Sequence, residues 1–155
     1  ERHAIGILTK YKELALHEAG IRLCGDDHLV EKAVFDAVGD KANGIYAQLV
    51  YHKSFNDEAA VFYQKYVEKL GTPPGSILNA LGYGNIYAIY HGLKKAGTNE
   101  EVEVLAQSLR EIEYDSPLGT GLYFDDNGQL HGATGTVVQF VKGEVVLDPD
   151  KWIKF

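Results

Sequence analysis

Residues 17–29 read HEAGIRLCGDDHL, and this stretch predicts a helix end, a short strand and a polar loop in succession. Gly20 is typical of the residue that ends a helix. Ile21–Cys24 is expected to be a short strand, and the loop Gly25-Asp26-Asp27-His28 follows it. Leu29–Val38 then carries apolar residues at helical spacing. The order of helix, strand and helix predicts an α/β arrangement for this part of the chain.

The segment before this stretch has two interpretations. Ala4–Thr9 is largely apolar, which favours a buried strand followed by a helix over Lys10–Ala19. Ile5, Leu8 and Tyr11 share helical spacing, which favours one longer helix instead. We take the strand as the expectation and keep the longer helix as the alternative.

The middle of the chain is predicted to be helical, after a strand over Gly44–Tyr51. Asn56 or Asp57 is a suitable cap for a helix that ends at Gly71, and Ile77–Lys95 predicts a longer helix. Thr98-Asn99-Glu100-Glu101 fits a capping box for a further helix with Val102, Leu105, Leu109 and Ile112 on its apolar face.

The last part of the chain is predicted to be antiparallel β. Leu122–Phe124 begins a strand, and Asp125-Asp126-Asn127-Gly128 is typical of a hairpin turn. Thr136–Val141 and Glu144–Leu147 are expected to pair through a hairpin at Lys142-Gly143.

Composition excludes several classes of protein. The chain has 155 residues and a net charge of −7, so we expect no nucleic acid partner, because phosphate binding needs clustered Lys and Arg. No apolar run approaches the roughly 20 residues that span a bilayer. The single Cys24 has no partner for a disulfide within the chain, and its apolar strand predicts a buried thiol. The sequence contains no Met, so we expect a processed form or a piece of a longer protein.

Asp26, Asp27 and His28 form the densest polar cluster of the sequence. Ligands of open α/β sheets bind beyond the carboxyl ends of strands, where a carboxylate can pair with a ligand ammonium group. The alternative is that Asp26 and Asp27 only cap the next helix. Because the three residues are consecutive, we expect that they do not all face one metal ion, and the other histidines lack ligand spacing. We therefore expect no metal and no cofactor.

Catalytic motifs are scarce. The sequence has no Gly-x-Ser-x-Gly elbow, and the turn at Asp125–Gly128 lacks the later Glu of a calcium loop. Tyr83, Tyr87 and Tyr90 fall at i, i+4 and i+7 on one predicted helix. A packing stripe is the favoured interpretation of these three rings, and a wall for a small organic ligand is the alternative.

Five segments in order resemble the C-terminal half of a type I periplasmic binding protein of the branched-chain amino-acid (Leu/Ile/Val) group. They are HEAGIRLCGDDHL (17–29), DAVGDKANGIYAQLVYH (36–52), AAVFYQKYVEKLGTPPGSILNALGYGNIYAIYHGLKKAGT (59–98), SPLGTGLYFDDNGQLHG (116–132) and VVQFVKGEVV (137–146). Each motif is degenerate alone, and their order makes the resemblance specific.

The resemblance implies an α/β chain that is part of a two-lobed fold ending in antiparallel β-hairpins. Residues 1–50 and 131–155 would belong to the C-terminal lobe and residues 51–130 to the N-terminal lobe. Crossings between the lobes are expected near Leu49–Lys53 and Gln129–Thr136. The carboxylate that holds the amino group of the ligand is matched best by Asp27, beside Asp26 and His28, and Tyr83 matches a recurrent Tyr of the first lobe.

The resemblance further implies the solute-binding component of an ABC importer, which captures a small amino-acid-like ligand by hinge closure and is not an enzyme. Its partners would be that ligand, which is either an amino acid or an aromatic solute, and the transporter permease. Its location would be periplasmic or extracellular, either lipid-anchored or secreted. A ligand-sensing domain of a receptor is the alternative, and an α/β enzyme that uses Asp27 and His28 is a remote one. Because first-lobe strands are missing, we expect the isolated chain to self-associate.

Overall fold

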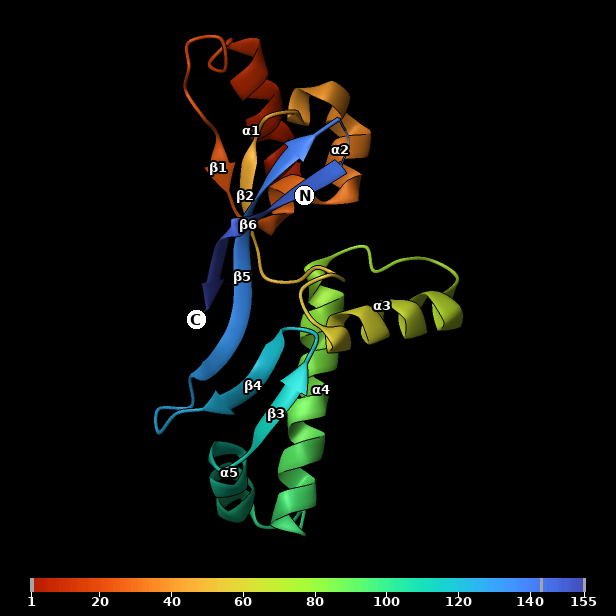
Figure 1. Cartoon of the computed structure of the whole chain (residues 1–155), viewed down its shortest axis with the longest axis vertical. Coiled ribbons are helices and arrows are strands. Elements are labelled where there is room, and N and C mark those ends of the chain that lie inside the picture. The colour runs from red at the N-terminus through yellow and green to blue at the C-terminus, as the bar shows by residue number, and fades with distance from the viewer. Residues whose placement is uncertain (1, 143, 155) are drawn as a thin grey trace. The chain divides into compact units, whose positions relative to one another are not determined.

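The computed structural model describes residues 2–142 and 144–154. The chain divides into two compact units, and Figure 1 labels their elements. Of the described residues, those within 2–50 and 135–153 form unit 1, and those within 51–134 form unit 2 together with Lys154. Both division points lie within the ranges expected for the crossings. The assignment of the units to two lobes stays a prediction.

Unit 1 is built on a mixed sheet. Its elements are α1 (Arg2–Glu13), β1 (Cys24–Gly25), the 3-10 helix η1 (Asp27–Val30), α2 (Lys32–Val38), the 3-10 helix η2 (Gly39–Ala42), β2 (Tyr46–Leu49), the second part of β5 (Leu130–Val141) and β6 (Glu144–Lys154). β1 pairs with β2 in parallel, β2 pairs with β5 antiparallel, and β6 also pairs with β5. Leu8, Val34, Ile45 and Val138 are among its buried core residues.

The first helix differs from the expectation. Ala4–Thr9 is not a strand but lies inside α1, so the prediction of a strand was wrong and the alternative of a longer helix is confirmed. The reason is the helical spacing of Ala4, Leu8 and Tyr11, which places all three on one buried face. The helix ends at Glu13 and not at Ala19, because Ala15 adopts a positive φ of 50°.

Cys24 also differs from the expectation. It lies at the start of β1, and its side chain is exposed, not buried. β1 is only two residues long and pairs with β2 alone among the described strands, so it is an edge strand.

Unit 2 contains three helices and an antiparallel sheet. Its elements are α3 (Asp57–Leu70), α4 (Ile77–Ala96), α5 (Val102–Arg110), β3 (Glu113–Ser116), β4 (Gly119–Phe124) and the first part of β5. β4 pairs with both β3 and β5, which confirms the predicted antiparallel ending of the fold. The predicted hairpin turn is also present, and Asp125 Oδ1 accepts the backbone N–H groups of Asn127 and Gln129.

Local signals explain where α3 and α4 begin and end. Asn56 Oδ1 accepts the N–H of Ala59 at 2.7 Å and so caps α3. Ser76 and Asn79 form a capping box at the start of α4. The predicted capping box from Thr98 to Glu101 was wrong: Glu101 is the N-cap of α5 without a side-chain cap bond among the described residues, and Thr98 accepts the N–H of Glu100 instead.

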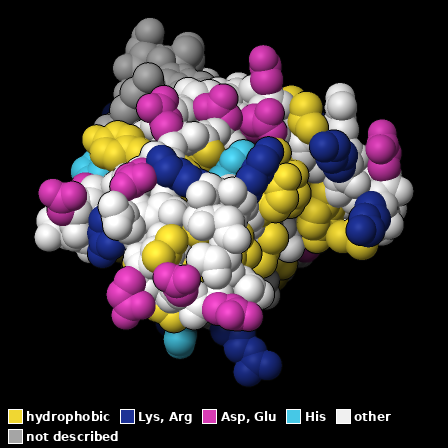
Figure 2. Space-filling view, turned by 90° about the horizontal axis from the view of Figure 1, so that it is seen from below, with side chains coloured by type: hydrophobic (Ala, Val, Ile, Leu, Met, Phe, Trp, Pro, Cys, Tyr) yellow, Lys and Arg dark blue, Asp and Glu magenta, His cyan; other side chains and the backbone are white. Residues whose placement is uncertain are grey.

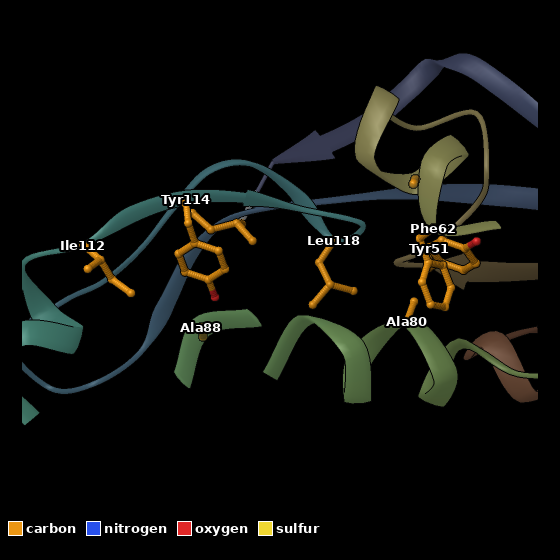
Figure 3. Close-up of a cluster of buried hydrophobic side chains, with 9 residues drawn as sticks. Tyr51, Phe62, Ala80, Ala88, Ile112, Tyr114 and Leu118 are labelled. Atoms are coloured by element: carbon orange, nitrogen blue, oxygen red, sulfur yellow. The ribbon is translucent and has the colours of Figure 1, made fainter. Parts of the chain in front are cut away.

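Small residues on α4 allow its close contact with the rest of unit 2. Ala80, Gly84, Ala88 and Gly92 recur every four residues and are all buried. They face a cluster of buried side chains that Figure 3 shows along α4: Tyr51, Phe62, Ile112, Tyr114 and Leu118 are among those labelled. The core of unit 2 therefore depends on a helix face without bulky side chains.

The opposite face of α4 is apolar and exposed. Leu78, Ile86, Ile89 and Tyr90 retain between 46% and 68% of their accessible surface. Figure 2 shows hydrophobic side chains exposed among acidic and basic ones on the face that it draws. Such side chains are available for contact with other protein surface.

Candidate functional site

Asp26, Asp27 and His28 lie where β1 ends and η1 begins. Asp26 has an extended backbone and is the N-cap of η1, since its Oδ1 accepts the N–H of His28 at 3.2 Å. The Asp26 carbonyl also accepts the N–H of Leu29 at 3.1 Å. The interpretation of Asp26 as a cap is therefore confirmed, whereas Asp27 and His28 are left with side chains that the cap does not use.

The tight turn of η1 brings the three side chains together. His28 Nδ1 lies 3.5 Å from Asp26 Oδ1 and 3.6 Å from Asp27 Oδ1. One donor atom from each of the three residues lies within 4.8 Å of the others. The expectation that these consecutive residues do not all face one metal ion stays a prediction, although the 3-10 turn brings their donor atoms closer together than an extended strand would.

Asp27 is the least exposed member of the cluster, with 13% of its side-chain surface accessible. Its Oδ2 is buried and has no hydrogen-bond partner among the described residues, and the same holds for His28 Nδ1. Burial raises the pKa of the Asp27 carboxyl, whereas the neighbouring His28 opposes that shift. A buried carboxylate oxygen without a partner is costly, so this atom favours a cationic or hydrogen-bonding ligand.

A cavity of about 320 Å³ lies beside the cluster within unit 1. Its walls are formed by His3, Ala4 and Ile7 of α1 together with Asp26, His28 and Leu29. A Cβ atom at Gly25 would lie 2.5 Å from Leu29 Cδ1, so a larger residue there would require the Leu29 side chain to move. The cavity therefore has an apolar side and a side of carboxylate and imidazole groups, as small-molecule sites commonly do.

The sequence of the whole chain adds the decisive observation. The sequence model of the family described as periplasmic binding protein matches residues 2–144. The chain belongs to the periplasmic binding protein family. The resemblance to the type I group that the sequence suggested is thereby confirmed.

Solved structures of such binding proteins share the fold. A leucine-binding protein from Thermotoga maritima is 20% identical with a TM-score of 0.80, over 99% of this chain and 42% of that chain. An ABC transporter substrate-binding protein from Sphaerobacter thermophilus is 20% identical with a TM-score of 0.82 and the same coverage. A solute-binding protein from Rhodopseudomonas palustris, in complex with 4-hydroxybenzoate, is 18% identical with a TM-score of 0.78, over 97% and 42%.

This chain therefore spans less than half the length of the solved structures that it matches. The comparison with curated proteins found no match. Within the described part of the chain, every helix is too short or too polar to cross a membrane.

Tyr83 lies on α4 in unit 2, where its ring packs against Phe62 at 5.0 Å and stacks on Tyr87 at 5.5 Å between centroids. These contacts support the packing interpretation for Tyr83 and Tyr87, whereas Tyr90 is 55% exposed. A contact between Tyr83 and a ligand stays a prediction.

His3 is the residue of the cavity that the sequence did not indicate. Its position in the sequence does not distinguish it from the other scattered histidines, some of which have local roles, such as the contact of His131 Nε2 with Asp125 Oδ2 at 3.3 Å. His3 is separated from Asp26 by more than a helix and a turn along the chain. No local sequence pattern predicts that His3 lies close to Asp26. The helical spacing of Ala4 and Ile7 predicts only that these two residues share a face of α1.

Proposed function

We propose that this chain is part of the solute-binding component of an ABC importer, and that it captures a small amino-acid-like ligand without chemical change. The family match over residues 2–144 supports this role, as does the shared fold of solved substrate-binding and solute-binding proteins of ABC transporters. The observation that carries the site is the buried Oδ2 of Asp27, which has no hydrogen-bond partner among the described residues and lies between two residues, Asp26 and His28, that line a cavity at the carboxyl end of β1. The protein then works in the periplasm or outside the cell and delivers its ligand to a membrane permease.

The proposed mechanism is hinge closure. Residues 1–50 and 131–155 form the C-terminal lobe and residues 51–130 belong to the N-terminal lobe, and the division into two compact units supports this. Ligand contacts made by both lobes stabilise the closed state, and the ligand shifts the equilibrium by its differential affinity for that state.

The proposed ligand carries an ammonium group. Asp27 accepts that group, with Asp26 and His28 beside it. The cavity next to Asp27 is lined by the Asp26 carboxylate and by the imidazoles of His3 and His28, and its described walls include neither Lys nor Arg. A ligand whose only charge is a carboxylate, such as the 4-hydroxybenzoate of one neighbour, would meet the carboxylate of Asp26 in the cavity wall, with Asp27 next to it in the chain. An aromatic amino acid carries both the ammonium group expected from Asp27 and the ring expected of an aromatic solute.

A thermal-shift screen of the purified protein against amino acids and hydroxybenzoates tests the ligand class, since a tight ligand raises the melting temperature by mass action. Calorimetry then compares the wild type with Asp27→Asn. Leaving one side of a buried charge pair unpaired costs about 2–5 kcal/mol, so we expect the affinity for the amine to fall by at least about 30-fold.

Asp36→Asn is the matched control. Asp36 is an exposed aspartate of α2 that pairs with Lys32 at 2.5 Å, away from the residues that line the cavity. We expect this variant to bind as the wild type does, because exposed pairs contribute little. Equal affinity of Asp27→Asn and the wild type would refute the assignment of Asp27.

A further inference from the structure

The sequence contains two Asn-Gly pairs, Asn43-Gly44 and Asn127-Gly128. In such a pair the backbone nitrogen of the glycine can attack Cγ of the asparagine side chain, because glycine has no Cβ atom to hinder the approach. The N–Cγ bond forms, the Cγ–Nδ2 bond breaks, and ammonia leaves with the proton of the backbone nitrogen. Water then opens the cyclic imide to aspartate or isoaspartate. Since the two pairs share this chemistry, their surroundings determine which one reacts.

Asn43 is held in place by hydrogen bonds of its side chain. Its Oδ1 accepts the backbone N–H of Lys142 at 2.6 Å, and its Nδ2 donates to Asp40 Oδ1 at 3.2 Å. The N–H of Gly44 donates to the carbonyl of Phe140 in β5 at 2.7 Å. Attack by the Gly44 nitrogen therefore requires that the side chain leave both partners and that the backbone separate from a strand of the unit 1 sheet.

Asn127 lies in the turn between β4 and β5, and both Asn127 and Gly128 are exposed. The side-chain amide of Asn127 makes no hydrogen bond within the part of the chain that the structure describes. The N–H of Gly128 donates to the carbonyl of Asp125 at 2.9 Å, a bond inside the same short turn. An exposed turn opens locally at a lower free energy than a strand inside a sheet, so the Gly128 nitrogen becomes available for attack while the rest of unit 2 stays folded.

We propose that Asn127 is a site of spontaneous deamidation in the folded protein and that the structure protects Asn43 from the same reaction. Either product adds one negative charge to a turn that already carries Asp125 and Asp126. Isoaspartate also lengthens the main chain of the turn by one carbon atom. It therefore disturbs the bonds that Asp125 Oδ1 accepts from the N–H groups of Asn127 and Gln129.

The test is the ageing of the purified chain at mildly alkaline pH, followed by peptide mapping with mass spectrometry. The rates at Asn127 and Asn43 are measured in the same sample, once in buffer and once in guanidinium chloride, which supplies the intrinsic ratio of the two rates. We expect the ratio of the rate at Asn127 to the rate at Asn43 to be at least about tenfold higher in the folded protein, because only Asn43 has side-chain hydrogen bonds to lose. An equal ratio in buffer and in denaturant would overturn the proposal.

Asp40→Ala tests why Asn43 is protected, because it removes the acceptor of the Asn43 Nδ2 group. We expect this variant to raise the rate at Asn43 and to leave the rate at Asn127 unchanged, which serves as the internal control for global unfolding. Asp36→Ala is the matched control, since it removes an exposed carboxylate of unit 1 that pairs with Lys32, and we expect both rates to stay as in the wild type. A rate at Asn43 that Asp40→Ala does not change would contradict the assigned protection. Solute binding plays no part in these measurements, so the proposed function stands or fails separately.

Discussion

At the scale of the residue, the most informative features are two buried oxygen atoms, Asp27 Oδ2 and Tyr51 Oη, that have no hydrogen-bond partner within the part of the chain that the structure describes. Asp27 Oδ2 lies in unit 1, and its chain neighbours Asp26 and His28 line a cavity. Tyr51 Oη lies in the apolar core of unit 2, where the ring packs edge-on against Phe62 at 5.6 Å. The first atom therefore indicates function, whereas the second indicates a cost in stability.

Tyr51→Phe tests that cost. Because the substitution removes a buried hydroxyl without a partner and keeps the ring, we expect a free energy of unfolding that is unchanged or higher by about 1 kcal/mol. Urea denaturation at neutral pH measures it. A loss of more than about 1 kcal/mol would show that the hydroxyl has a stabilising partner.

Tyr51 also makes the free energy of unfolding depend on pH in the alkaline range. Burial raises the pKa of Tyr51 to about 12 from its ordinary value of 10.0. Between these values the unfolded phenol loses its proton while the folded one keeps it, so stability falls as the pH rises from 10 to 12. We expect Tyr51→Phe to lose less stability than the wild type when denaturation midpoints are compared at about pH 9 and about pH 11. Part of the loss of stability remains in Tyr51→Phe, because burial also raises the pKa of Tyr114. An equal loss of stability between the two pH values in the variant and the wild type would contradict the prediction.

Single residues were predictable where their role is local. The caps at Asn56 and Asp26 and the turn at Asp125 each depend on hydrogen bonds within four residues, and the sequence indicated all three. His3 and the exposure of Cys24 depend on which elements meet in space, and no short pattern encodes that.

At the scale of the element, α4 shows how one helix serves two purposes. Its small residues face the core of unit 2, and its large apolar residues face outward. A Cβ atom on Gly92 would lie 2.6 Å from Leu109 Cδ2, whereas one on Gly82 would have no atom within 4 Å among the described residues. The two glycines therefore differ in the space around them: an added methyl group has room at Gly82 and none at Gly92 unless Leu109 moves.

Gly82→Ala and Gly92→Ala form a matched pair on this helix. Alanine is favoured over glycine in a helix by about 0.8–1.0 kcal/mol, and we expect Gly82→Ala to raise the free energy of unfolding by up to that amount. We expect Gly92→Ala to lower it by about 1–3 kcal/mol, because the added methyl overpacks against α5. Urea denaturation of both variants provides the comparison, and a gain in stability at Gly92 would mean that Leu109 moves aside freely.

Long elements were easier to predict than short ones. The bounds of α3 and α4 follow from caps and glycines in the sequence, as Gly71 and Gly97 with their positive φ illustrate. The prediction of a strand over Ala4–Thr9 was wrong because a short apolar run is compatible with a buried strand and with a buried helix segment. The burial of Ala4 and Leu8 on one helical face distinguishes the two only once the fold of unit 1 is known.

At the scale of the molecule, two compact units share the strand β5. Leu130 and His131 pair with β4 in unit 2, and Thr136–Gln139 pair with β2 in unit 1. The order of five motifs indicated the family and the α/β class. The sequence did not reveal the cavity, because its walls come from α1 and η1, whose approach depends on packing.

The exposed apolar face of α4 predicts that the isolated 155-residue chain self-associates. Leu78, Ile86, Ile89 and Tyr90 expose apolar surface that water disfavours. Light scattering is expected to give a mass above that of one chain, and the double variant Ile86→Lys, Ile89→Lys is expected to lower it. A sharp monomer in the wild type would contradict this prediction.

The most direct test of the account is the structure of the protein with the solute selected by the thermal-shift screen. We predict that the ammonium nitrogen of the solute lies within about 3.2 Å of Asp27 Oδ2, the distance of a charge-assisted hydrogen bond. A solute bound elsewhere, with that oxygen still unpaired, would contradict the account.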